Sequence, residues 1–228
     1  IGVTGVQTCA LPISNEVFID SATLRENVVA LARNIGYLPR SKKASRSTIS
    51  FFVDTTDIFP TPSSLTLKKG PVAASGLQFG GESFVFGITE DVTVAVIDGF
   101  ANFENLEVYE GTMINQSFTK NDRNFRQRFI LDNIGIDLDT LKVSVKESQT
   151  SSASVKYTRQ DNLFAETGGA TITGSSTVYF IQEIEDEKYE LIFGDGIFGK
   201  KLENGNVVEV SYIVTSGSSA NGLNSFTF

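Results

Sequence analysis

Three glycines near the end of the chain have the spacing of a nucleotide-binding loop. They spell G-x-G-x-x-G within YELIFGDGIFGKKLENGNVVEV, residues 189–210. A dinucleotide-binding loop follows a strand and opens a helix whose N-terminus holds the pyrophosphate. Here a strand pattern precedes the glycines, but an Asn-Gly turn pair and an alternating strand pattern follow them. The sequence therefore predicts turns that join strands and no nucleotide site. The residues of these predicted structural turns are Gly194, Asp195, Gly196, Gly199, Asn204 and Gly205.

Carboxylates and basic residues offer the other possible chemistry. Asp137 and Asp139 stand two apart, like a phosphatase nucleophile and its helper, but Leu141 stands where that motif has Thr or Val. The acidic stretch EIEDEKYE, residues 183–190, could attract a divalent cation. KNDRNFRQRF, residues 120–129, interleaves basic and aromatic residues as single-strand nucleic-acid grooves do. For the first two we favour an Asp-capped turn and a charged hairpin tip. For the third, a strand with a basic face explains the pattern equally well.

The composition excludes several kinds of function. The chain has no His and no Trp, and Cys9 is its one cysteine, so neither a Ser-His-Asp triad nor a Cys/His zinc site can form. The net charge of −8 disfavours a phosphate-backbone partner. No apolar run reaches the ~20 residues that span a bilayer. We therefore predict that the protein is not an enzyme, with no catalytic residue, metal or cofactor, and with no nucleic-acid or membrane partner.

One helix is predicted, near the N-terminus. Its apolar residues recur at spacings of four, three and four, which puts them on one face: Leu24, Val28, Leu31 and Ile35. Asp20 or Ser21 can cap its start, Thr23 and Glu26 have a capping-box spacing, and Gly36 can take the left-handed position after its end. The apolar face packs either on the protein's own sheet or in a helix bundle with a partner chain.

The remainder of the chain is predicted to form strands. From residue 48 onward, short runs of β-branched and aromatic residues alternate with turn residues. The expected fold is mainly β with an N-terminal helix, and its short antiparallel strands form one or two sheet domains. We expect a helical segment and basic linker at 15–47, a first β region at 48–115, and a second at 116–228 that is truncated at its C-terminus.

Residues 1–14 are set apart from this prediction. VTGVQTCALPIS, residues 3–14, resembles the translation of a sequencing-library adapter. The alternative is a genuine short apolar leader. A secretory leader carries a basic region, and residues 1–14 contain no Lys or Arg. We therefore interpret them as an adapter artefact.

Several longer stretches carry a family resemblance. They are SATLRENVVALARNIGYLPRSKKAS at 21–45, FGDGIFGKKLENGN at 193–206, SYIVTSG at 211–217 and ANG at 220–222. In this order they resemble baseplate wedge proteins of T-even-type contractile-tailed bacteriophages, within the wider J-like baseplate assembly family. The resemblance covers nearly all of 15–228, although Gly70-Pro71 departs from the more usual Gly-Thr.

The resemblance implies a structural role in a virion. A baseplate wedge subunit would form a homodimer or ring through self-association, contact other baseplate wedge proteins, surround the tail tube and rearrange when the sheath contracts. It would assemble in the host cytoplasm, and its helix face would pack in a bundle between subunits. The alternative is a β-rich surface adhesin or carbohydrate-binding module, which would have a secretion signal and exposed aromatic platforms.

Overall fold

The computed structural model describes residues 16–34, 41–75, 83–160, 172–223 and 225–227. These residues contain one α-helix, α2 (Arg25–Asn34), and short 3-10 turns η1 (Glu185–Glu187) and η2 (Ser218–Ala220). Within them no helix is long and apolar enough to cross a membrane. The strands are β1 (Arg46–Asp54), β2 (Ser64–Leu67), β3 (Gly70–Ser75), β4 (Val85–Ile88), β5 (Val92–Ile97), β6 (Phe100–Glu110), β7 (Thr112–Thr119), β8 (Phe129–Leu131), β9 (Ile136–Lys146), β10 (Ser154–Arg159), β11 (Val178–Glu183), β12 (Tyr189–Phe193), β13 (Val207–Val214) and β14 (Phe226–Thr227).

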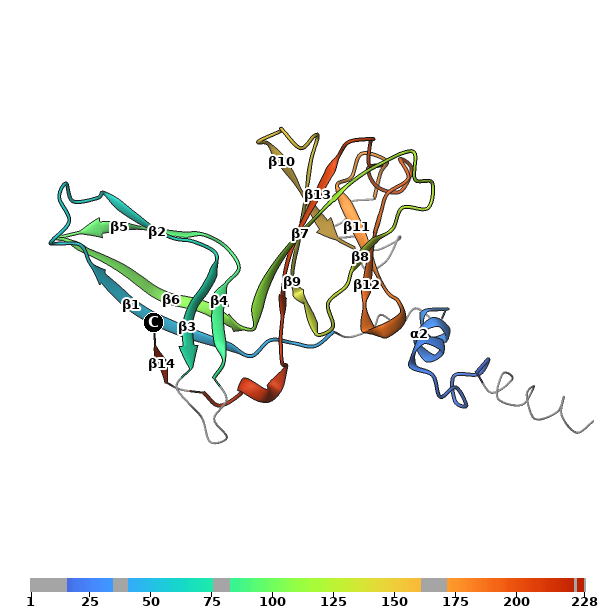
Figure 1. The fold of residues 1–228 in the computed structure, drawn as a ribbon, viewed down its shortest axis with the longest axis horizontal. Coiled ribbons are helices and arrows are strands. Elements are labelled where there is room, and N and C mark those ends of the chain that lie inside the picture. Colours follow the sequence, from blue (N-terminus) through green and yellow to red (C-terminus); the bar gives the residue numbers. More distant parts are fainter. Residues whose placement is uncertain (1–15, 35–40, 76–82, 161–171, 224, 228) are drawn as a thin grey trace, which may run out of the picture. The chain divides into compact units, whose positions relative to one another are not determined.

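The prediction of a mainly β protein with a helix near its N-terminus is confirmed (Figure 1). Not every strand pair is antiparallel, however. β10 pairs with β11 in parallel, with Thr158 opposite Val178. A parallel pair needs a long connection between its strands, and β10 ends at Arg159 while β11 begins at Val178.

The chain forms two compact units, each built from separate segments. Unit 1 contains Ile1–Arg40, Lys120–Ile134 and Tyr157–Asn206, and unit 2 contains Ser41–Thr119, Gly135–Lys156 and Val207–Phe228. The chain therefore passes from one unit to the other several times. The division into 15–47, 48–115 and 116–228 stays a prediction about domain boundaries.

Unit 2 is organised around the long strand β6. One sheet has the strand order β14-β3-β4-β6-β5-β2, with β1 paired to β6. Residues of β6 alternate between a buried and an exposed face, but Phe103 and Leu106 are both buried although they are three apart. The pairing with β1 shifts by one residue at this point, where Asn105 has a φ of 53°. This bulge keeps both apolar side chains on the same face of the sheet.

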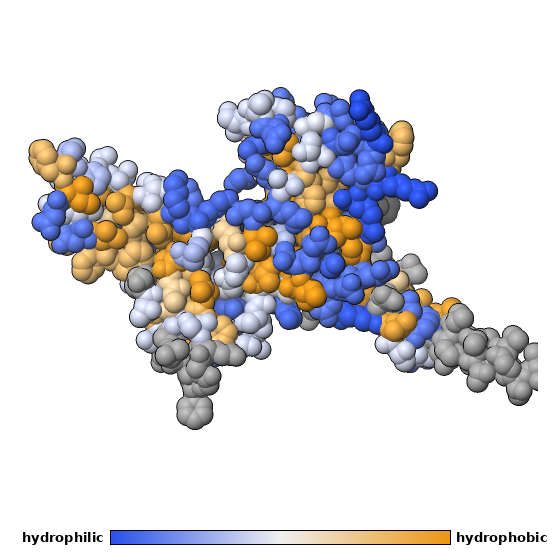
Figure 2. Space-filling view, viewed as in Figure 1, coloured by the Kyte–Doolittle hydropathy of each residue, from blue (hydrophilic) through white to orange (hydrophobic). Residues whose placement is uncertain are grey.

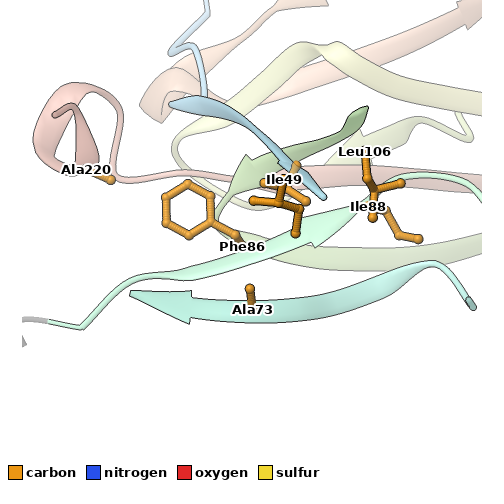
Figure 3. Close-up of a cluster of buried hydrophobic side chains, with 7 residues drawn as sticks. Ile49, Ala73, Phe86, Ile88, Leu106 and Ala220 are labelled. Carbon is orange, nitrogen blue, oxygen red and sulfur yellow. The ribbon is translucent and has the colours of Figure 1, made fainter. Parts of the chain in front are cut away.

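A hydrophobic cluster fills the buried face of this sheet. Figure 3 shows its side chains pointing toward one another from β1, β3, β4, β6 and η2. Phe86 is almost fully buried, and its ring meets that of Phe226 edge to face at a centroid distance of 5.0 Å. Each large apolar side chain buried here stabilises the fold by about 1.5–3 kcal/mol. The buried members are Ile49, Ala73, Phe86, Ile88, Leu106, Val108 and Ala220.

The remaining strands of unit 2 also pair closely. β13 lies between β7 and β9 and is antiparallel to both. Beside them the buried carboxylate of Glu110 accepts hydrogen bonds from the hydroxyls of Thr215 and Ser216. This carboxylate at the end of β6 therefore holds the segment that follows β13.

Unit 1 combines helix α2 with β8, β11, β12 and the last residues of β10. β12 lies between β11 and β8 and is antiparallel to both. The ring of Phe193 meets Phe129 and Tyr157 edge to face at centroid distances of 5.3 and 5.7 Å. Burial raises the pKa of Tyr189 to about 12. Unit 1 thus has an aromatic core of its own.

Candidate functional site

The glycine loop after β12 is a tight turn. The side chain of Asp195 accepts hydrogen bonds from the backbone N–H groups of Ile197 and Phe198, at 2.8 and 2.9 Å. These two bonds, the one from Phe198 first, lower the pKa of the Asp195 carboxyl. A Cβ at Gly194 would lie 2.2 Å from the backbone carbonyl of Gly199. The close spacing of the glycines therefore lets two stretches of backbone pack against each other.

No helix follows this loop, because β13 is the next regular element. The turn at Asn204-Gly205 precedes it, and Gly205 has a φ of 89°. The Asn204 side chain accepts a hydrogen bond from the Asp122 N–H at 3.0 Å, and the Gly205 N–H donates to the Lys120 carbonyl at 2.9 Å. This turn thus positions the loop that begins at residue 120.

Helix α2 is capped by a residue well before it. The carboxylate of Glu16 accepts hydrogen bonds from the Thr23 hydroxyl at 2.6 Å, the Thr23 N–H at 3.0 Å, the Leu24 N–H at 3.2 Å and the Asn27 amide at 2.8 Å. The Thr23 hydroxyl and then Asn27 are the largest causes that lower the pKa of Glu16 to about 2. Sequence reasoning missed this residue, because capping rules look only one to four residues from the helix start.

The predicted interface face of the helix keeps solvent access. Leu24 lies just before α2 and is exposed, while Val28 and Leu31 are half-buried. Ile35 and Gly36 lie outside the described residues. Three of the four predicted interface residues therefore share an accessible face at the start and middle of the helix. Their use as an interface stays a prediction.

A different face of the helix is buried within unit 1. Val29 and Ala32 are its buried residues. Arg25 lies 2.9 Å from the buried carboxylate of Glu183 at the end of β11, and 3.6 Å from Glu187. The contact between α2 and its own unit is thus part apolar and part ionic, and it leaves the Leu24 face available.

The two aspartates that resemble a phosphatase pair serve different contacts. Asp137 is fully buried and accepts hydrogen bonds from the Ala44 N–H at 2.9 Å and the Asp139 N–H at 3.0 Å. Asp139 is partly exposed and lies 3.2 Å from Lys43 and 3.6 Å from Arg46. Asp137 therefore anchors the segment before β1 to β9, with both carboxylate oxygens engaged by backbone donors.

The acidic stretch 183–190 forms the connection between β11 and β12. The Ile184 N–H donates to the Lys188 carbonyl at 2.8 Å, which closes the turn. Throughout the described residues, no three acidic side chains gather in a way that could hold a metal ion.

In the basic stretch 120–129, some side chains contact the rest of unit 1 and others are exposed to solvent. Arg128 donates two hydrogen bonds to the carboxylate of Glu190, at 2.9 and 2.6 Å. Phe129 is buried, whereas Phe125 is 97% exposed. Arg123 and Arg126 flank Phe125 and are also exposed. The stretch therefore ends in a structural ion pair and presents one free aromatic ring between two cationic side chains.

A second accessible feature lies at one end of the unit 2 sheet, where the turn Asp98-Gly99 joins β5 to β6. We call it the apolar tip. Apolar residues gather over the β1, β2, β5 and β6 region in Figure 2. Sequence reasoning missed the tip, because alternation shows that neighbouring residues face opposite ways but does not show which face is covered. Its exposed apolar residues are Phe52, Ile58, Phe59, Ile97 and Phe100.

Comparison with known proteins bears on the role of these surfaces. No family model matches the chain. A search of curated proteins finds a match over 229 residues with 25% identity. The chain is similar to baseplate wedge protein gp6 of Enterobacteria phage T4. The similarity covers 93% of this chain, and the chain spans 32% of the length of that protein. The interpretation of residues 1–14 as adapter stays a prediction.

Proposed function

We propose that this chain is a structural subunit of a phage tail baseplate wedge. It joins copies of itself and other baseplate wedge proteins in a ring around the tail tube, and the ring rearranges when the sheath contracts. Its place is the tail baseplate of the virion, after assembly in the host cytoplasm. The observation that carries the proposal is the similarity to the baseplate wedge protein of phage T4 along 93% of the chain.

The geometry of the polar residues supports a structural role. Of the two aspartates spaced like a phosphatase pair, Asp137 is buried and accepts backbone hydrogen bonds on both carboxylate oxygens, and Asp139 pairs with Lys43 and Arg46. A carboxylate whose oxygens are filled by fixed backbone donors has little capacity left to bind substrate or to transfer a proton. These side chains hold loops in place, which is what an assembly subunit requires.

The helix supports self-association. Its Leu24, Val28 and Leu31 face keeps solvent access, while Val29 and Ala32 pack within unit 1. A helix with two apolar stripes can pack against its own unit with one stripe and against a partner with the other. In the proposed wedge this second face packs against a helix of a neighbouring subunit.

The genes beside the one that encodes this chain test the proposal. Sequencing both flanks should reveal genes for tail tube, sheath or other baseplate proteins. Genes for secretion or surface attachment on both flanks would contradict the proposal and favour the adhesin alternative.

A further inference from the structure

The apolar tip breaks the usual division of a sheet into a buried and a polar face. Phe52, Ile97 and Phe100 are exposed, whereas Phe103 and Ala101 on the opposite face are fully buried. Pairing places Ile97 opposite Phe100, and the Phe52 and Phe100 rings meet edge to face at 5.8 Å. A solvated sheet face normally carries polar residues, so this end of the sheet has the composition of a contact surface.

The segment after β1 adds the most accessible side chain of the tip. The Thr55 N–H and hydroxyl donate to the Gly99 carbonyl at 2.8 and 2.7 Å, which holds this segment beside the β5–β6 turn. The Ile58 N–H donates to the Thr55 carbonyl at 3.1 Å and tightens it further. Phe59 follows directly and is 97% exposed. The tip therefore presents a free phenyl ring on an anchored loop.

The charge around the tip is all negative. Asp54, Asp57 and Asp98 are exposed there. The sequence has no Lys or Arg between Arg46 and Lys68, and none from Val92 to Phe103. An apolar surface ringed by carboxylates favours a partner whose apolar groups are flanked by Lys or Arg.

The loop 121–126 of unit 1 has the complementary composition. It borders an open hollow of about 610 Å³ lined by Asn121, Asp122, Arg123, Phe125 and Asn204. Asp122 is paired with Lys120 at 3.0 Å, so their charges offset each other. The net charge beside the exposed ring of Phe125 is therefore positive, and it comes from the exposed side chains of Arg123 and Arg126. We call this surface the basic loop.

We propose that the apolar tip of one copy of this chain docks on the basic loop of a second copy. Phe59 enters the hollow beside Phe125 and Arg123, where ring–ring and cation–π contacts are available, and Asp57 approaches the arginines. The two surfaces differ, so the contact is heterologous and, when repeated, builds a ring or an open chain of copies. The inference rests on the self-association in the proposed function and adds a second contact to it, beside the one made by the helix face.

Charge exchange between the two surfaces tests this docking. The variants are Asp57→Lys, Arg123→Glu, and the double variant with both changes. Glu147→Lys changes the charge of unit 2 by the same amount away from the tip and serves as the matched control. Each variant is first checked for an unchanged circular dichroism spectrum, and its mass is then followed against concentration by sedimentation velocity.

We expect the wild-type chain to self-associate and each single variant to do so at least about tenfold more weakly, because like charges then face each other. The double variant, and an equimolar mixture of the two single variants, should recover association. Phe59→Ala should weaken association by a similar factor, since truncation of a central aromatic anchor has a large effect. Glu147→Lys should behave as the wild type.

Two results would overturn the docking. If the wild type self-associates and both single variants match it, other surfaces join the copies, and the self-association in the proposed function stands without this contact. If the wild type stays monomeric at every concentration, the docking and the self-association both fail. The flanking genes test the baseplate role separately in either case.

Discussion

Replacement of Asp137 by alanine should destabilise unit 2 strongly, whereas the same change at Asp139 should have little effect. Asp137 is fully buried, and its carboxylate accepts from two backbone N–H groups, those of Ala44 and Asp139. The Ala44 N–H is buried and that of Asp139 is partly buried. A buried donor left without an acceptor costs about 1–3 kcal/mol, so Asp137→Ala should lower the free energy of unfolding by at least that amount. The side chain of Asp139 is 44% exposed and makes ion pairs with Lys43 and Arg46. Such pairs contribute about 0–1 kcal/mol.

Urea unfolding followed by circular dichroism measures this difference. Asp137→Asn is an intermediate variant, because it keeps one oxygen acceptor but turns an amide donor toward the other N–H group. Native-state hydrogen exchange adds a local test, since the Ala44 amide should exchange faster in Asp137→Ala than in Asp139→Ala. Equal destabilisation by the two alanine variants would refute the reasoning, and so would a larger effect at Asp139.

Three further predictions concern unit 1. Gly194→Ala should lower the free energy of unfolding by about 1–3 kcal/mol in urea titration, because the new Cβ meets the backbone of Gly199; a fully stable variant would mean that the two segments do not touch. The lowered pKa of Glu16 means that its stabilising bonds are complete above its ordinary value of 4.5 and are lost as the pH falls from there toward about 2. Carbon NMR of the Glu16 carboxyl checks this, and a midpoint near 4.5 would contradict it. Leu31→Asp should weaken self-association, because it buries an unpaired charge if the helix face meets a partner; an unchanged mass in light scattering, with the fold intact, would rule that interface out.

The strand content could be predicted because it depends on the residues within each strand. A two-residue period in apolar side chains identifies strands without knowledge of their partners, and the mainly β prediction is confirmed. Pairing is not local, so the parallel pair of β10 and β11 could not be foreseen. The interleaving of the units also depends on contacts between distant segments, such as the bond from Ala44 to Asp137.

The candidate sites show the same limit. The turn at Asn204-Gly205 and the helix α2 follow from short-range rules about glycine and apolar spacing. The cap from Glu16 requires the chain to fold back over seven residues to Thr23, which no capping motif describes. Phe51 and Phe52 are adjacent and chemically equal, so the sequence does not show which of them faces solvent. Only the pairing with β6 decides this, and it leaves Phe52 on the accessible face.

The location of the protein in a virion tests the central claim most directly. Antibodies raised against this chain can be applied to contractile-tailed particles from the culture that carries the gene and located by immunogold electron microscopy. The account predicts gold at the baseplate end of the tails. Gold on the surface of the host cells, with the tails unlabelled, would contradict it.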